Sequence, residues 1–438
     1  MFQVISTITR GANRLTANSF IGRRLLRTVA VEDDLAAVTD IDERHEAAPA
    51  SVGLRDEAVA AIWRAVEDMY CTGYYPAVML CVRRRGKIVL NRAIGHASGF
   101  GEGGAVPRLV TTETPACIYS ASKAITAMLV HRLADEGHIN LLDPVAHYVP
   151  EFGRHGKDKL SILQILAHRG GVPGIKTSLP MEALIDHKTL FKLICDAEPI
   201  DAHGRTQAYH AITGGTVLQA VLEHVTGEPI ERYWLDHFKT PMGFKHFAYG
   251  ATGAAFANMA RDLFTGVPVP RMFREYFKQY LGLDVEVDRD FINHPAFFRE
   301  PVPAGNMIAT AEEASRFFQM LLDDGVWRQR RIVGPLAVHR ATRETSPHQF
   351  DNVLKVPLRY SAGMMLGGDP MGLFGWKTGN AFGHLGMINI FVWADPDRDL
   401  SCALLATGKP LLAHNLPYVA NVLARISRGV PRDGRSMQ

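Results

Sequence analysis

The residues Tyr119-Ser120-Ala121-Ser122-Lys123 place a hydroxyl and an amine three positions apart, where an irregular segment gives way to a helix. Apolar residues recur at helical spacing after Lys123, and Gly137 ends the pattern, so Ser120 is predicted at a helix N-terminus. Residues three apart on a helix are neighbours, which brings the Lys123 amine within reach of the Ser120 hydroxyl. The spacing predicts a nucleophile beside its base, provided that burial lowers the pKa of the lysine.

A simpler interpretation of the same motif is a helix cap followed by a solvated lysine, because Ser-x-x-Lys also occurs by chance. Ser120 is nevertheless the only serine of the chain with lysine at the third following position. The motif therefore needs partners elsewhere in the sequence before it predicts an enzyme.

Composition excludes several classes of protein. The chain has 438 residues with 47% hydrophobic content, enough for a sizeable core, and its formal net charge of +3 gives no support for a nucleic-acid partner. Its five cysteines show no Cys-x-x-Cys pairing, which is typical of buried thiols in a reducing compartment. Histidines lack metal-ligand spacing and there is no glycine-rich phosphate loop, so no metal and no cofactor are expected.

No apolar run is long enough to span a bilayer, and we expect a cytoplasmic protein. Residues 1–31 contain five arginines and no acidic residue. If the source is eukaryotic, this basic segment also fits a mitochondrial transit peptide.

Two strand pairs are predicted far apart in the chain. Val78 to Val82 and Ile88 to Ala93 flank a polar turn, and Met387 to Trp393 and Leu400 to Ala406 flank a Pro-containing turn. The segments between them have mainly helical patterns, for example 160–167, 181–195 and 213–225, and a last helix is expected near 412–427. The fold class is therefore α+β, with an antiparallel sheet flanked by N- and C-terminal helices and a mainly helical second domain.

The predicted domain boundaries follow from this pattern. Residues 53–123 and 304–430 form the sheet domain, 124–303 form the helical domain with a lid-like insertion, 1–52 are an N-terminal extension and 431–438 a tail. The aromatic residues between Phe264 and Phe298 fit either a pocket lid or an ordinary helix core, and core is favoured for most of them. A cleft between the two domains is the natural place for a site.

The chain resembles the serine β-lactamase-like group of class C β-lactamases, D-alanyl-D-alanine carboxypeptidases and family VIII esterases, from about Pro76 to Gly408. The resemblance rests on ordered blocks: the hairpin 78–95, Ser120-Ala121-Ser122-Lys123, Leu166-Ala167-His168, Tyr209-His210-Ala211, Pro303-Ala304-Gly305-Asn306 and His384-Leu385-Gly386. It implies a β-lactamase/transpeptidase-like fold and acyl transfer to a serine.

Site residues follow from the resemblance by position. Ser120 would be the acylated nucleophile, Lys123 its proton partner, and Tyr209 a phenol of lowered pKa that shares the role of general base. His384 and Gly386 would border the cleft, and the N–H groups of Ser120 and Met387 would form the oxyanion hole. Without this proximity, Tyr209 is an ordinary buried tyrosine.

Lys377-Thr378-Gly379 matches the Lys-Thr-Gly motif of the β-lactamases literally, yet it precedes a segment that starts a central strand poorly. We therefore assign that position to His384-Leu385-Gly386. A neutral histidine and a leucine replace the groups that bind a β-lactam carboxylate, and Ala211 replaces the usual asparagine. These differences predict a preference for small neutral carboxylic esters.

Alternative functions share the same residues. An acyltransferase, a D-amino-acid peptidase and a weak β-lactamase all fit the motifs, and a catalytically inactive scaffold is a candidate from a different class. The expected partner is a small-molecule ester, and the oligomeric state is open.

Overall fold

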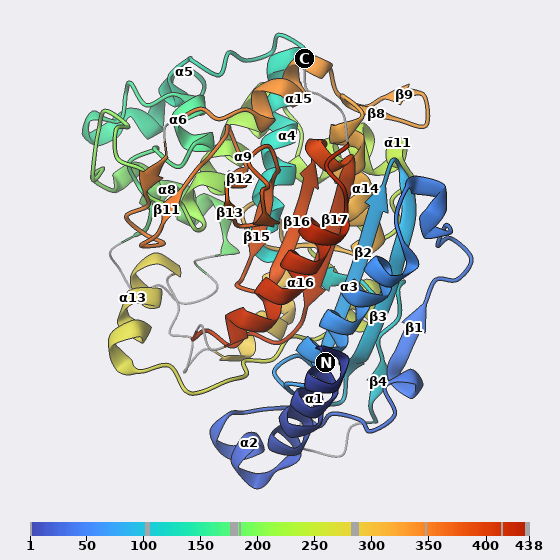
Figure 1. Cartoon of the computed structure of the whole chain (residues 1–438). Helices are drawn as coiled ribbons and strands as arrows, with labels where there is room; N and C mark the ends of the chain where they lie inside the picture. The colour runs from blue at the N-terminus through green and yellow to red at the C-terminus, as the bar shows by residue number, and fades with distance from the viewer. Residues whose placement is uncertain are drawn as a thin grey trace.

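The computed structural model describes residues 2–100, 106–175, 183, 185–281, 289–346, 348–412 and 415–433. Its central element is an antiparallel sheet of eight strands (Figure 1). In spatial order the strands are β1 (Thr39–Ile41), β3 (Lys87–Ser98), β2 (Ala77–Arg84), β17 (Leu400–Ala406), β16 (Ile390–Asp395), β15 (Phe382–Gly386) and β12 (Met365–Leu366), and β4 (Arg108–Leu109) pairs with β3. The predicted α+β class with an antiparallel sheet is confirmed.

The sheet joins the two ends of the chain. β2 pairs with its hairpin partner β3 and also with β17, so that Val78 lies opposite Ala406. The early hairpin and the β16–β17 hairpin were both predicted, and both are confirmed.

One strand boundary was predicted wrongly. The apolar run from Met387 was interpreted as a single strand, but β16 begins at Ile390, and residues 387–389 form the turn that joins it to β15. Met387 and Ile388 have φ values of 30° and 73°, in the left-handed region. Neither residue type favours that region, so nothing in the apolar pattern marks the turn.

Side chains of the central strands alternate between two cores. Val78, Leu80 and Val82 of β2 face one core, and Met79 and Cys81 face the other. Because successive side chains of a strand point to opposite faces, a sheet covered on both sides needs this continuous apolar run.

Helices cover both faces of the sheet. α3 (Asp56–Tyr70) and α16 (Leu416–Gly429) pack against each other on one face, in front of the strands in Figure 1. α14 (Ala311–Leu322) packs on the other face against β2, β16 and β17, and α4 (Ser122–Asp135) packs against β15 and α15 (Pro335–Thr342). The predicted C-terminal helix near 412–427 corresponds to α16.

The segment after α4 is mainly helical. It contains α5 (Val145–Tyr148), α6 (Ile162–Leu166), α8 (His187–Asp196), α9 (Thr213–Thr226), α10 (Ile230–Trp234), α11 (Thr240–Met242), α12 (Gly253–Asn258) and α13 (Arg271–Leu281). The predicted helix at 213–225 is α9, and α6 is shorter than its predicted range. Of the predicted helix at 181–195, α8 forms the second part, and residues 181, 182 and 184 lie outside the described residues.

Short strands complete the fold. β5 (Ala116–Cys117), β7 (Met307–Ala309) and β6 (Ala248–Tyr249) form a small sheet directly before Ser120. The remaining pairs are β8 (Val326–Trp327) with β9 (Arg330–Arg331), β10 (Gln349–Phe350) with β11 (Pro357–Leu358), and β13 (Met371–Gly372) with β14 (Gly375–Trp376).

The N-terminal segment also has structure. α1 (Phe2–Asn18) and α2 (Phe20–Leu25) lie at one end of the molecule, and Thr39–Ile41, which the sequence leaves in the extension, pair with β3. Among the described residues, no helix has the length and apolar character that crossing a membrane requires.

Candidate active site

The chain turns sharply just before Ser120. Tyr119 lies in a 3-10 turn (Tyr119–Ala121) between β5 and α4 and has a left-handed φ of 45°. Its buried phenol donates a hydrogen bond of 2.7 Å to Asp262 Oδ2, and Asp262 Oδ1 lies 3.0 Å from Lys409 Nζ. This buried chain of contacts holds a backbone conformation that a tyrosine rarely adopts.

A second serine fixes the same turn from the other side. Ser122 Oγ donates to the carbonyl oxygen of Tyr119 at 2.5 Å and accepts the N–H of Met307 at 3.1 Å. Ser122 therefore ties the start of α4 to β7, and its hydroxyl is fully used within the fold.

Lys123 reaches Ser120 as the helical spacing predicts. Its Nζ donates to Ser120 Oγ at 3.0 Å and to the carbonyl oxygen of Ala304 at 2.9 Å. The side chain is buried, and the salt bridges of the described residues do not include it. Burial without a negative partner lowers the pKa of Lys123 well below its usual value, which favours the neutral amine that a base requires.

This burial also makes stability depend on pH. The unfolded chain keeps the Lys123 proton up to a pKa of about 10.4, whereas the folded chain releases it at lower pH. Between these two values the unfolded state binds more protons, so the unfolding free energy rises with pH.

Lys123→Met should remove this contribution of the lysine to the unfolding free energy. Denaturant titrations from about pH 7 to pH 10 should then show the free energy of wild type rising relative to the variant. A constant or falling difference would contradict the buried neutral amine.

Tyr209 lies against both residues. Its phenol lies close enough to Ser120 for the serine hydroxyl to influence the pKa of the phenol, and Lys123 Nζ lies 4.9 Å from the centroid of its ring. Its N–H donates to Asp351 Oδ1 at 3.2 Å, which fixes the loop before α9.

The expected lowering of the Tyr209 pKa is wrong for this structure. Burial raises the pKa of Tyr209 above its usual value, because a phenolate would lose its hydration. Lys123 is itself driven towards its neutral form, so it supplies little positive charge to stabilise a phenolate. The geometry therefore favours a neutral phenol beside a neutral amine.

His384 lies on β15 opposite Val392 of β16 and is fully buried. Its ring centroid is 6.2 Å from that of Tyr209. Burial lowers its pKa to about 3, so the imidazole is neutral near pH 7. Nδ1 lies 2.6 Å from the carbonyl oxygen of Leu385 and must donate, which leaves Nε2 as an acceptor. Nε2 is buried and has no hydrogen-bond partner among the described residues.

Gly386 allows β15 to approach the turn at Ser120. A Cβ at this position would lie 2.1 Å from the carbonyl oxygen of Ile118. Only glycine permits this contact, and the next residue, Met387, lines the same cavity as Ser120. By contrast, Lys377 of the literal Lys-Thr-Gly sequence is exposed in the turn after β14 and does not line the cavity.

A cavity of about 350 Å³ opens beside Ser120. Its wall is largely apolar and contains no charged side chain; it is formed by Tyr119, Ser120, Ile185, Tyr209, Ala211, Ile212, Tyr276, Tyr280, Phe291, Phe297, Val302, Ala304, Gly305, Val353, Leu354, Met365, Leu385, Met387, Ile388 and Leu411. Core was favoured for most of the aromatic residues between Phe264 and Phe298, and some of them, such as Tyr276 and Phe291, line the cavity. The cavity suits an uncharged, apolar ligand.

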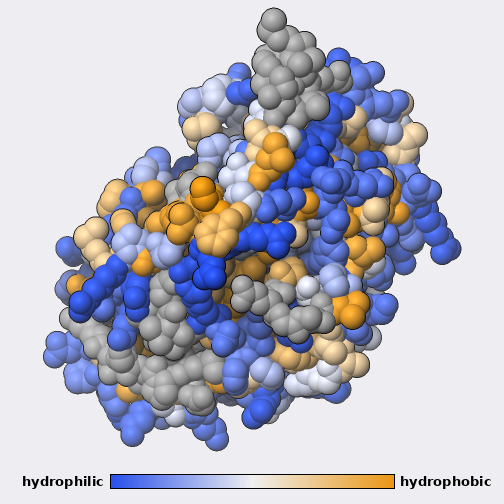
Figure 2. Space-filling view, turned by 90° about the horizontal axis from the view of Figure 1, so that it is seen from below, coloured by the Kyte–Doolittle hydropathy of each residue, from blue (hydrophilic) through white to orange (hydrophobic). Residues whose placement is uncertain are grey.

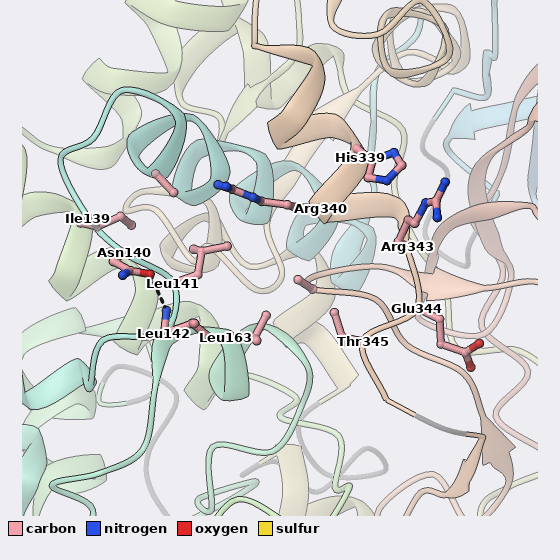
Figure 3. Close-up of a pocket in the computed structure, with 12 residues that line it drawn as sticks. Ile139, Asn140, Leu141, Leu142, Leu163, His339, Arg340, Arg343, Glu344 and Thr345 are labelled. Carbon is pink, nitrogen blue, oxygen red and sulfur yellow. Dashed lines mark hydrogen bonds between the residues drawn. The ribbon is translucent and has the colours of Figure 1, made fainter. Parts of the chain in front are cut away.

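A larger cavity of about 590 Å³ lies elsewhere, between α15, the loop after α4 and α6 (Figure 3). In Figure 3 the Arg340 side chain extends towards Ile139, whereas Glu344 points away. None of its lining residues forms a nucleophile and base pair like Ser120 and Lys123. Chemistry, rather than size, identifies the cavity beside Ser120 as the candidate site.

Sequence reasoning missed the residues that support Tyr209. The His168 ring centroid lies 4.6 Å from that of Tyr209 and 4.8 Å from that of Tyr360, and Tyr360 donates to Asp351 Oδ2 at 3.1 Å. His168 Nδ1 accepts the N–H of His210 at 3.1 Å. The block Leu166-Ala167-His168 pointed to His168, but nothing in the sequence indicated its contact with Tyr209.

Comparisons with known proteins agree with this geometry. A family model described as Beta-lactamase matches residues 58–424. The esterase/beta-lactamase LipL of Mycobacterium tuberculosis is 25% identical over 373 residues, which cover 81% of this chain and 82% of that protein.

Two solved structures are similar in fold. The structure of a family VIII carboxylesterase has a TM-score of 0.73 at 22% identity, covering 86% of this chain and 99% of that one. A penicillin-binding protein homologue from Caulobacter crescentus has a TM-score of 0.71 at 22% identity, with the same two coverages. Because the family model matches most of its length, the chain belongs to the beta-lactamase family, a group of serine hydrolases that includes esterases, amidases and carboxypeptidases.

Proposed function

We propose that this chain is a carboxylesterase that cleaves esters of small neutral substrates through an acyl-Ser120 intermediate. The observation that carries the proposal is the 3.0 Å contact between Lys123 Nζ and Ser120 Oγ at the edge of an apolar cavity without charged side chains. Ser120, Lys123 and Tyr209 are the proposed catalytic residues.

In the first step, Ser120 Oγ attacks the ester carbonyl while its proton passes to the neutral amine of Lys123, directly or through the Tyr209 phenol. The N–H groups of Ser120 and Met387 would stabilise the oxyanion. Ser120 suits this role because the first N–H groups of a helical turn have no acceptor within the turn.

The intermediate then collapses, and the alkoxide leaving group takes the proton back from the Lys123 and Tyr209 pair. A water molecule next attacks the acyl-serine, gives one proton to the same pair and releases the carboxylic acid. Ser120 regains its proton, so one water is consumed in each turnover.

The neutral cavity supports a substrate without charge. His384 is neutral, fully buried and not among the residues that line the cavity, so it presents no positive charge to a substrate there, and neither Ala211 nor Leu385 can bind a carboxylate. Burying an unpaired carboxylate here would cost several kcal/mol.

This predicts a large preference between two esters of matched length. We expect kcat/KM for 4-nitrophenyl hexanoate to exceed that for the 4-nitrophenyl half-ester of adipic acid by at least about 100-fold, roughly 2.7 kcal/mol. Stopped-flow release of nitrophenolate measures both. Equal values, or faster turnover of the half-ester or of penicillins, would contradict a neutral substrate class.

A second prediction tests the close approach of β15. Gly386→Ala should lower kcat/KM at least about tenfold, because the new Cβ pushes Met387 N–H away from the oxyanion. Gly379→Ala is the matched control, since the nearest atom to its Cβ would be Asp369 Cβ at 3.8 Å. The proposed oxyanion role of Met387 fails if both variants retain full activity.

Labelling by a fluorophosphonate separates the enzyme from an inactive scaffold of the same fold, because only an activated serine reacts. Placement in the cytoplasm stays part of the proposal. Its support is that all five cysteines are buried and free, as is usual in a reducing compartment.

A further inference from the structure

The N-terminal helices expose a group of large apolar side chains. Leu15 at the end of α1 and Phe20, Ile21 and Leu25 on α2 are 76%, 76%, 60% and 62% exposed. We call these four residues the α1–α2 patch. Figure 2 views the molecule from the end at which α2 lies. On this face, hydrophobic residues (orange) lie next to hydrophilic residues (blue).

The opposite side of these helices is fixed to the protein. Arg10 forms ion pairs with Glu67 and Asp68 of α3, and Asn13 Nδ2 donates to the Tyr418 hydroxyl at 2.8 Å. Ala17 is fully buried. The patch therefore points outward from docked helices and contributes nothing to the core that holds them.

Positive charge accompanies the patch. Of the five arginines in residues 1–31, Arg10 pairs with Glu67 and Asp68, and Arg14 pairs with Asp33. Arg23 and Arg24 lie on α2 beside the patch and form no salt bridge within the described part of the chain. The Arg24 guanidinium lies 5.8 Å from the centroid of the Phe20 ring. Exposed apolar residues next to unpaired arginines are typical of a helix that lies in a membrane interface.

We propose that the α1–α2 patch binds the surface of an anionic lipid membrane. The apolar side chains enter the boundary between head groups and acyl chains, and Arg23 and Arg24 contact the anionic head groups. A second copy of the chain is less suited than a membrane to cover the patch, because a twofold contact would bring the arginines of one patch against those of the other.

α13 lies at the lower left of Figure 1, and α2 lies at the bottom of the same view. α13 exposes Met272 and Phe273 and contributes Tyr276 and Tyr280 to the cavity wall. Membrane binding does not depend on the proposed esterase activity.

Vesicle co-sedimentation of the full chain tests the proposal. We expect binding to vesicles of phosphatidylcholine mixed with phosphatidylglycerol, weaker binding to phosphatidylcholine alone, and loss of binding at high salt. Arg23→Gln with Arg24→Gln should weaken binding about 25-fold, from roughly fivefold for each arginine near an anionic surface. Phe20→Ser with Ile21→Ser should weaken it comparably.

The matched control is Leu142→Ser with Leu336→Ser, which removes exposed apolar side chains from other parts of the surface and should leave binding unchanged. All three double variants should keep the thermal midpoint of wild type, since every altered side chain is exposed. The proposal is overturned if anionic vesicles do not bind wild type, or if all variants bind equally. It is also overturned if Phe20→Ser with Ile21→Ser instead dissociates a dimer in sedimentation velocity, which would assign the patch to a second copy.

Discussion

Ser120→Ala is expected to abolish ester hydrolysis, with kcat/KM falling at least about 10⁴-fold. Removing a serine nucleophile from a serine hydrolase costs this much or more, because the remaining groups cannot form the acyl intermediate. The substitution removes only one oxygen at the edge of the cavity, so the fold should persist. Steady-state hydrolysis of 4-nitrophenyl hexanoate, with circular dichroism of the same sample, measures both quantities.

Ser122→Ala is the informative control for this substitution. Its hydroxyl bridges Tyr119 and Met307 rather than facing substrate, so its loss should cost about 1–2 kcal/mol of stability by unpairing a buried N–H. Labelling of Ser120 by a fluorophosphonate should remain. The assignment of the nucleophile is wrong if Ser120→Ala hydrolyses the ester at an undiminished rate.

Lys123→Met should lower kcat at least about 10³-fold, within the range attributed to a positioned base. Methionine has nearly the length of the lysine stem and suits a buried site. The loss of the hydrogen bond to Ala304 is offset by removing a buried amine from its poorly solvated environment. The thermal midpoint near pH 7 is therefore expected to change little, so that loss of activity without loss of fold identifies a catalytic role.

Lys377→Met is the matched control, because it makes the same replacement at the exposed lysine of the literal Lys-Thr-Gly sequence. This variant should retain the activity of wild type. If instead Lys377→Met is inactive and Lys123→Met is active, the site has been assigned to the wrong lysine.

Local patterns predict the parts of this protein that depend on neighbours in sequence. The hairpin turns, the alternation along β2 and β17, and the three-residue spacing of Ser120 and Lys123 are all set within short segments, and each is present in the structure. Local patterns do not predict the start of β16, because the turn at Met387 and Ile388 uses residues that do not favour positive φ. Its conformation is imposed by the approach of β15 to Ile118, a contact between distant segments.

Protonation and cavity shape also depend on distant contacts. The resemblance suggested a lowered pKa for Tyr209, yet burial acts in the opposite direction, which supports Lys123 as the proposed proton acceptor. The cavity walls come from α13, from the loop holding Val353 and from the turn at Met387. No periodicity in those segments indicates that they meet around Ser120.

Intact mass after brief mixing with 4-nitrophenyl hexanoate and acid quench tests the central claim most directly. An activated Ser120 predicts a mass increase equal to one hexanoyl group, located on the peptide that contains Ser120 and absent from Ser120→Ala. Two results would contradict it. The first is an adduct on any other residue. The second is a wild-type protein that releases nitrophenolate although it gains no mass and is not labelled by a fluorophosphonate.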